Sequence, residues 1–383
     1  MTDFVFYGDT ERSPAMRHEL PVSIGDPFLL AIIGGQMHLT VSELEHTRVA
    51  VAAPDAVLHT FTDLGFHELL GTGVSHHELD LELASRGAAA MGIRSAVADP
   101  EMPVAVADRL RSDGIAVQPD QMAIAARRRV KSAAELAGIR RAQTAAESGM
   151  AAAAAVLGRA VPDGDRLVLA GEALTAETVR TALRDACQSS GAPAPPDVIV
   201  ASVWQGQGHD PGSGPLPANL PIVIDPWPRD ELSACCADMT RTFVVGEIGA
   251  DVRAAEALVR TALERAREAV RPGVTGRELH ALACEVFESA GHRTQRTGPG
   301  DDPYEGFQFS LGHGVGLAVH EGPSLGQTGP DELVAGDVIA MEPGLSQRGI
   351  GEVRLEDLLL VTDDGCETLT RCSYELVPSL VRS

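Results

Sequence analysis

The sequence contains no long apolar run and no cysteine pattern typical of a structural zinc site. No segment approaches the roughly 18 consecutive apolar residues that a membrane-spanning helix needs, and the chain opens with the polar stretch MTDFVFYGDTERSP rather than a secretory signal peptide. The six cysteines form no zinc-type CxxC pair. We therefore expect a soluble, cytoplasmic protein that is reduced and has no membrane partner.

Positive charge is also scarce. Lysine occurs once, at Lys131, and 31 lysines and arginines together face 54 aspartates and glutamates, which gives a formal net charge of −23. This charge would repel a nucleic acid unless a local basic patch outweighed it. The one basic run, RRRVK at 127–131, is too short for that and is interpreted as the solvated start of a helix. The composition therefore argues against a nucleic-acid partner.

The apolar content suffices for two globular domains. Hydrophobic residues make up 44% of 383 residues, a length that exceeds the usual size of one domain. In the first part, short apolar runs alternate with helix-like stretches, which predicts a smaller α/β domain over residues 1–130. Within it, Ser75 and Glu78 have the spacing of a capping box. We interpret the adjacent His76 and His77 as a solvated first helical turn rather than a metal site.

A second pattern of predicted helices and strands begins at residue 131. Ser132 and Glu135 form another capping pair, followed by apolar residues at helical spacing, which predicts a long helix. A shorter helix and three strand-like runs follow: DVIVASV, PIVIDPW and TRTFVVG. From Asp251 the same order recurs, ending in GVGLAVHEG, DVIAMEPG and VRLEDLLLVT. The recurrence predicts an internal duplication in a domain over residues 131–383, with a sheet buried under helices and a cleft between the halves.

Five potential metal ligands lie in or beside these strand-like runs. They are four carboxylates and one imidazole: Asp225, Asp238, His313, Glu342 and Glu356. Each alone has an ordinary explanation, such as a turn, a cap, a buried ion pair or a satisfied core histidine. As a set they favour metal binding as the explanation, because four acids in apolar strands could not all ionise side by side without a counter-charge. A divalent metal supplies that charge.

The ordered series VIDPW, ADMTRTF, LGHGVGLAVHEGP, MEPG and VRLED resembles the pita-bread metallopeptidases, the family of methionine aminopeptidase, aminopeptidase P and prolidase, to which creatinase is related. The resemblance covers residues 131–378, and the preceding part resembles the smaller creatinase-like domain of aminopeptidase P and prolidase. It implies an α/β (α+β) fold: a pita-bread catalytic domain with an internal pseudo-twofold duplication, preceded by a smaller α/β domain.

By this resemblance the five ligands hold two divalent metal ions. Asp238 and Glu356 match the carboxylates that bridge both ions. Asp225 matches the further ligand of one ion, and His313 and Glu342 match those of the other. Mostly oxygen ligands favour manganese, with cobalt, iron or zinc as alternatives. Two such ions share a hydroxide that attacks a peptide carbonyl, and the resemblance makes Glu342 the proton shuttle to the leaving nitrogen.

Two histidines and one arginine complete the expected site. In the family, the second histidine of the glycine-rich strip, here His320, contacts the substrate across the cleft and is not a ligand. His209, on the loop GQGHDPGSGPL, matches the family's other cleft histidine, although a loop histidine by itself is more often merely exposed. Arg354 lies two residues before Glu356, so on a strand its side chain points to the same face and can orient carboxylates.

Three features depart from the family pattern. The interval between the first two acidic ligands is longer than in familiar members. Within it, Cys235 and Cys236 stand at positions where relatives often have an aromatic residue. We interpret these cysteines as small buried hydrophobes rather than metal-capturing or redox-active thiols. Ser346 stands where many proline-specific members have tyrosine, and Phe309 stands where aminopeptidase P-like sequences often have histidine. Both changes are expected to affect specificity rather than the hydrolytic machinery.

The leading hypothesis is a metallo-exopeptidase that hydrolyses the Xaa-Pro bond of short proline-containing peptides, either as an Xaa-Pro aminopeptidase or as an Xaa-Pro dipeptidase. The amino-terminal domain favours these over methionine aminopeptidase, and its shortness slightly favours the dipeptidase. The alternative is a metal-dependent hydrolase or lyase of the same fold that acts on a nonpeptide metabolite. A catalytically inactive binding module is least favoured, because buried acids without metal reduce stability. The resemblance also implies a homodimer or higher homo-oligomer.

Overall fold

The computed structural model describes residues 2–203 and 208–378. The chain divides into two compact units, Met1–Arg128 and Arg129–Ser383, whereas the sequence placed the boundary after residue 130. Within the described ranges, no helix combines the length and apolar character needed to cross a lipid bilayer.

A mixed six-stranded sheet forms the centre of the first unit, in the order β4-β3-β2-β1-β5-β6. Its strands are β1 (Phe4–Gly8), β2 (Phe28–Ile33), β3 (Gln36–Val41), β4 (Val57–Thr60), β5 (Ser95–Ala98) and β6 (Ala116–Pro119). Its helices are α1 (Pro14–Glu19), α2 (His46–Ala52), α3 (Phe66–Gly71), α4 (His76–Met91), α5 (Val104–Ser112) and α6 (Gln121–Arg129). The predicted α/β architecture of this region is confirmed.

Local signals in this unit act as predicted. Both faces of the sheet are buried, because successive residues such as Val5 and Phe6 point to opposite faces and pack into different apolar clusters. At the start of α4, the Glu78 amide donates to the Ser75 hydroxyl over 3.2 Å and the Ser75 amide donates to the Glu78 carboxylate over 2.9 Å. The capping box is therefore confirmed.

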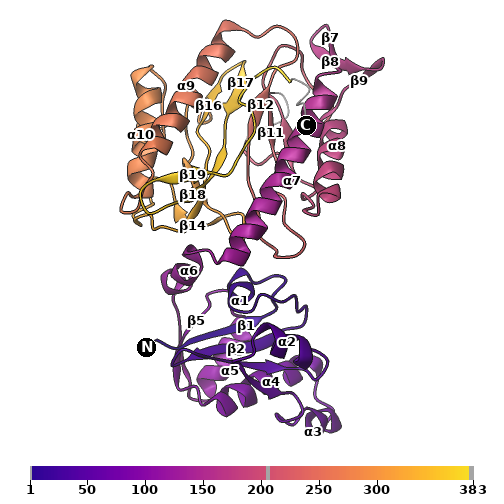
Figure 1. Ribbon diagram of the computed structural model, residues 1–383, viewed down its shortest axis with the longest axis vertical. Coiled ribbons are helices and arrows are strands. Elements are labelled where there is room, and N and C mark those ends of the chain that lie inside the picture. Colours follow the sequence, from indigo (N-terminus) through magenta and orange to yellow (C-terminus); the bar gives the residue numbers. More distant parts are fainter. Residues whose placement is uncertain (1, 204–207, 379–383) are drawn as a thin grey trace. The chain divides into compact units, whose positions relative to one another are not determined.

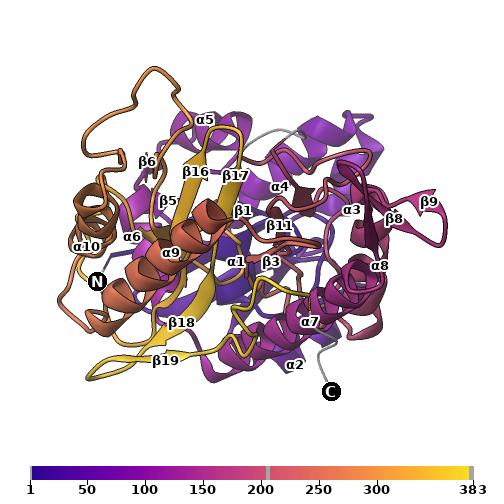
Figure 2. The ribbon, with the colours of Figure 1, turned by 90° about the horizontal axis from the view of Figure 1, so that it is seen from above.

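Two pairs of helices cover the strands of the second unit. They are α7 (Ala133–Leu157) with α8 (Ala176–Ser189), and α9 (Ala250–Glu268) with α10 (Gly276–Ser289). The two pairs flank the strands from opposite sides (Figures 1 and 2). The predicted capping box opens α7, because the Glu135 amide donates to the Ser132 hydroxyl and the Ser132 amide to the Glu135 carboxylate. The recurring order of two helices and strands is the predicted duplication.

The strands of the second unit form several small sheets. One has the order β14-β13-β15-β18-β19, another β10-β11-β12, a third β7-β8-β9, and β16 pairs with β17. Their bounds are β7 (Val161–Asp163), β8 (Arg166–Leu169), β9 (Glu172–Ala173), β10 (Ile199–Ala201), β11 (Ile222–Asp225), β12 (Arg241–Phe243), β13 (Gly312–Gly314), β14 (Glu321–Ser324), β15 (Val338–Met341), β16 (Gly344–Gln347), β17 (Gly351–Arg354), β18 (Asp357–Val361) and β19 (Cys366–Thr368).

Three local predictions were wrong. GVGLAVHEG is not one strand, because residues 315–320 form a loop between β13 and β14. VRLEDLLLVT spans two strands of different sheets, β17 and β18, which are separated by Leu355 and Glu356. The basic run ends helix α6 instead of starting a helix, and Lys131 is buried and pairs with Glu321. Each error concerns an element whose limits depend on distant packing partners.

Candidate metal centre

The five predicted ligands come from both halves of the second unit. Asp225 is the last residue of β11, and Asp238 lies in the extended stretch before β12. His313 is the central residue of β13, Glu342 follows β15, and Glu356 lies between β17 and β18. Only Asp225 and His313 therefore lie within strands, whereas the sequence analysis had placed all five residues in or beside strand-like runs. The others lie at strand ends, where the backbone can turn a side chain into the cleft.

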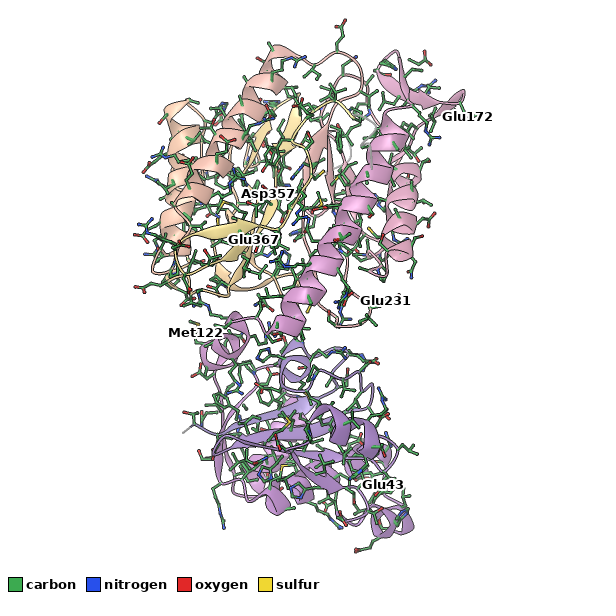
Figure 3. The ribbon with its side chains drawn as sticks, viewed as in Figure 1. Glu43, Met122, Glu172, Glu231, Asp357 and Glu367 are labelled. Carbon is green, nitrogen blue, oxygen red and sulfur yellow. The ribbon has the colours of Figure 1, made fainter. Side chains whose placement is uncertain are left out.

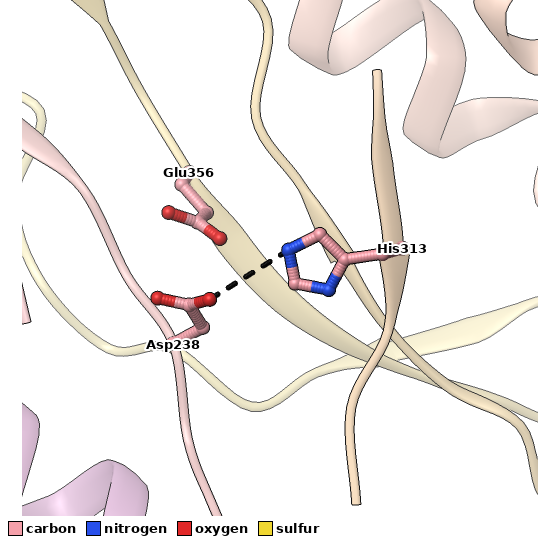
Figure 4. A group of neighbouring side chains, drawn as sticks. All are labelled: Asp238, His313 and Glu356. Carbon is pink, nitrogen blue, oxygen red and sulfur yellow. Dashed lines mark ion pairs between the residues drawn. The ribbon is translucent and has the colours of Figure 1, made fainter. Parts of the chain in front are cut away.

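Three of these residues form a compact cluster. Asp238, His313 and Glu356 each offer one ligand atom, and these atoms all lie within 4.8 Å of one another (Figure 4). The Nε2 atom of His313 lies 3.7 Å from an Asp238 oxygen and 3.6 Å from a Glu342 oxygen. Its Nδ1 atom lies 3.1 Å from the carbonyl of Gly314 and can donate to it, which leaves the lone pair of Nε2 directed at the carboxylates.

Arg354 joins the remaining two ligands to this cluster. Its guanidinium is 3.3 Å from Asp225 through Nη2 and 3.3 Å from Glu342 through Nη1. The expected proximity to carboxylates is thus observed, although the reason given for it was wrong, since Arg354 and Glu356 do not share a continuous strand. One arginine cannot balance four acids, so the cluster has an excess of potential negative charge.

The carboxylate oxygens themselves indicate a missing partner of positive charge. Among the described residues, one buried oxygen each of Asp225, Asp238 and Glu356 has no hydrogen-bond partner. A buried polar atom without a partner costs about 1–3 kcal/mol, and more when it is charged. Because these three oxygens belong to residues within one cluster, a divalent cation fits the donor set, which is rich in oxygen with a single imidazole.

The protonation of the metal-free cluster leads to the same conclusion. Burial, together with neighbouring carboxylates, raises the pKa of Asp238 and of Glu356 well above the ordinary range. Burial also raises the pKa of Glu342 to about 7, against the opposing effect of Arg354. Burial lowers the pKa of His313. The cluster therefore retains protons unless cations replace them.

A cleft of about 500 Å³ opens over the cluster and is lined by His313, Glu342 and Arg354. The ring of His320 meets that of His313 edge to face, with centroids 4.2 Å apart, and the ring of His209 lies 6.2 Å from that of His320. The structure thus places His320 against the ligand His313 and His209 next to His320, and both line the cleft. The volume is in the range of small-molecule and peptide sites.

The family comparison agrees with this geometry. The model of metallopeptidase family M24 matches residues 137–363, more than half of the chain. The chain belongs to metallopeptidase family M24. All five ligands lie within the matched region, and so do His209, His320 and Arg354.

Relatives of this M24 chain include peptidases of archaea and bacteria. The chain is 40% identical over 141 residues to the Xaa-Pro dipeptidase of Pyrococcus furiosus, a stretch that is 37% of each chain. It is 36% identical over 141 residues, 37% of this chain, to the probable dipeptidase PepE of Mycobacterium tuberculosis. These matches span little more than a third of the length of the curated relatives, 37% and 35%.

Solved structures resemble this M24 chain over nearly its whole length. The prolidase of Pyrococcus horikoshii has a TM-score of 0.74 at 23% identity, covering 98% of this chain and 95% of that one. The X-Pro aminopeptidase of Thermotoga maritima has a TM-score of 0.77 at 21% identity, covering 98% and 97%. The expected pita-bread fold with its additional amino-terminal domain is confirmed.

The residues that depart from the family pattern lie in two different places in the M24 fold, the cleft and an apolar cluster. Phe309 and Ser346 both line the cleft, so they contact whatever occupies it. Cys235 and Cys236 are buried in an apolar cluster, and burial raises the pKa of their thiols to about 11 and about 12. The interpretation of the two cysteines as buried hydrophobes is confirmed.

Sequence reasoning missed three residues that support the M24 centre. The Thr240 hydroxyl donates to Glu356 over 2.7 Å, and Glu352, on the cleft wall, lies 3.5 Å from Nε of Arg354. Arg241 is 1% exposed and donates to the carbonyl of Glu356 and to Asp357, which is labelled in Figure 3. The sequence held a signal only for the position of Thr240, which lies two residues after the ligand Asp238 and so shares its side of an extended segment; the contact of its hydroxyl with Glu356 had none.

Proposed function

We propose that this chain is a dinuclear metal-dependent exopeptidase that hydrolyses the Xaa-Pro bond of short peptides. The observation that carries the proposal is the convergence of four acids and one histidine beneath a cleft, with buried carboxylate oxygens that lack hydrogen-bond partners. The names of the dipeptidase relatives support peptides, and specifically Xaa-Pro peptides, as the substrate class.

In this proposal the five ligands divide between two ions. By the resemblance to the family, Asp238 and Glu356 would hold both ions; each has a buried oxygen without a hydrogen-bond partner in the described chain, as does Asp225. Asp225 would complete one ion, while His313 and Glu342, whose Nε2 and carboxylate oxygen lie 3.6 Å apart, would complete the other. We propose manganese, because four of the five side chains offer hard oxygen ligands.

When bound, the ions would polarise the scissile carbonyl and activate a water molecule as the nucleophile. The protein residues do the remaining work. Glu342 faces the cleft and takes a proton from the attacking water for delivery to the leaving nitrogen. Arg354 fixes the carboxylates of Asp225 and Glu342 by its two ion pairs. His209 and His320 line the cleft and are placed to contact the substrate.

The experiment is a paired peptidase assay on protein that has been stripped of metal and refilled with manganese. An Xaa-Pro dipeptide and an Xaa-Pro-Yaa tripeptide are compared with the matching Xaa-Ala peptide. We expect cleavage of a proline substrate that disappears in Glu342→Gln, a substitution that preserves side-chain volume. The ratio of the dipeptide rate to the tripeptide rate assigns the enzyme as a dipeptidase or an aminopeptidase. Equal cleavage of the alanine control would contradict proline specificity.

A second candidate function follows from two cleft residues. Phe309 and Ser346 both line the cleft, where an aromatic ring and a small hydroxyl could shape a site for a nonpeptide metabolite. The same metal centre would then serve a different hydrolase or lyase. Failure of every peptide substrate, with metal fully bound, would favour this candidate over the peptidase.

A further inference from the structure

A buried arginine on α8 binds the loop that carries His209. Arg180 is 9% exposed, and its Nε donates to the carbonyl of Val198 over 2.6 Å. Its Nη2 donates to the carbonyl of Gly212 over 2.8 Å and also to that of Pro211. Among the described residues, these hydrogen bonds of the guanidinium all go to main-chain oxygens. Burying a guanidinium costs free energy unless its donors are satisfied. Here they are satisfied by the Pro211 and Gly212 carbonyls of the loop and by the carbonyl of Val198, just before β10.

The same loop is held by other contacts on both sides. The Gly214 amide donates to the carboxylate of Glu177, one turn before Arg180 on α8, at 3.0 Å. On the other side, the Val200 amide of β10 donates to the carbonyl of Pro211 at 3.0 Å. Gly212 has φ +74°, and a Cβ at this position would lie 2.2 Å from the carbonyl oxygen of Val200. Residues 211–214 are therefore fixed between α8 and β10.

His209 lies two residues before this fixed segment. Asp210 accepts a hydrogen bond from the Gly212 amide at 2.9 Å, which closes the turn directly after the histidine. The His209 ring, exposed in the cleft, lies 6.2 Å from that of His320, which in turn contacts the ligand His313. The contacts made on α8 therefore reach to within two residues of a histidine that lines the cleft beside His320.

We propose that Arg180 is a positioning residue that fixes His209 in the cleft by holding the carbonyls of Pro211 and Gly212. The inference rests on the proposed function, because it takes His209 as a substrate contact. Lysine in place of Arg180 keeps the charge but cannot reach three carbonyls with a fork of fixed geometry. The loop then shifts, and His209 shifts with it.

The first test is a double-mutant cycle on the manganese-loaded enzyme. Since a misplacement of about 1 Å can cost up to about 100-fold in rate, we expect Arg180→Lys to lower kcat/KM for the Xaa-Pro substrate by about 10-fold or more. In a His209→Ala background the same change should have almost no effect. Arg184→Lys is the matched control, because Arg184 lies one turn further along α8 and donates to the carbonyl of Ala194 instead, at 3.2 Å. An equal loss in both backgrounds would show a purely structural role and overturn the proposal.

The second test does not depend on activity, so it separates this inference from the proposed function. The NMR signal of the His209 ring should move or broaden in Arg180→Lys and stay unchanged in Arg184→Lys. If Arg180→Lys does not fold, Glu177→Ala replaces it, because Glu177 is exposed and alanine removes the acceptor of the Gly214 amide in the same loop. An unchanged His209 signal in these variants would overturn the inference. If the His209 signal moves but the enzyme cleaves no peptide, the positioning role of Arg180 is supported and only the proposed peptidase function is rejected.

Discussion

Replacing Thr240 by valine should weaken metal binding without removing any ligand. Thr240 is fully buried, and its hydroxyl donates to one oxygen of Glu356 over 2.7 Å. The other Glu356 oxygen has no hydrogen-bond partner in the described chain and is free to bind metal. Valine has nearly the same shape but no donor, so the ionised carboxylate loses its orienting contact. A hydrogen bond to a charged group contributes about 1.5–3 kcal/mol, and removing such outer contacts lowers metal affinity by about 10- to 100-fold.

The assay is a competition titration in which a chelator of known affinity removes manganese from the protein. Thr240→Ser is the control, because serine keeps the hydroxyl and should bind metal within a few-fold of the wild type. We expect the apparent affinity of Thr240→Val to fall by about 10- to 100-fold, with the free energy of unfolding of the metal-free protein affected much less. Unchanged affinity in the valine variant would refute the reasoning that Glu356 is a ligand oriented by this hydroxyl.

Two further predictions concern the pH dependence of the stability that metal adds and the packing between helices α7 and α8. Because burial and nearby charges raise the pKa values of Asp238, Glu342 and Glu356 in the metal-free protein, the contribution of these three carboxyls to the stability of that form should fall as pH rises from about 5 to about 8. The difference in Tm between manganese-loaded and metal-free protein should therefore widen over this range, and a constant difference would contradict the pKa assignment. Gly149→Ala should lower the free energy of unfolding by about 1–3 kcal/mol, because its Cβ would lie 2.5 Å from Sγ of Cys187. Chemical denaturation measures this loss, and Cys187→Ala should restore most of it if the clash is its cause.

The sequence predicted those parts of the fold that depend on neighbouring residues. The capping boxes at Ser75 and Ser132 and the helices that follow them were confirmed, because a cap and an apolar stripe are local signals. The break between β17 and β18 was not predicted. Apolar alternation continues through Val353 and Leu355 without a glycine or proline, so nothing local marks the change from one sheet to another.

In the candidate site, too, local features could be predicted from the sequence and contacts between distant segments could not. The chemistry of Asp225 and Glu342 as buried acids could be read from their apolar surroundings, but their convergence came only from the resemblance to a known family. Contacts between distant segments, such as Thr240 with Glu356 and Arg180 with the loop after His209, had no signature in the sequence. They depend on packing between the two halves or between a helix and a loop, which only the folded chain shows.

We propose that five side chains form a centre for two metal ions. Native mass spectrometry of the manganese-loaded protein, counting ions per chain, tests it most directly. We expect two ions per wild-type chain and fewer in Asp238→Asn, because Asp238 is proposed to contribute to both ions. A wild-type chain that binds one ion or none at saturating manganese would contradict it.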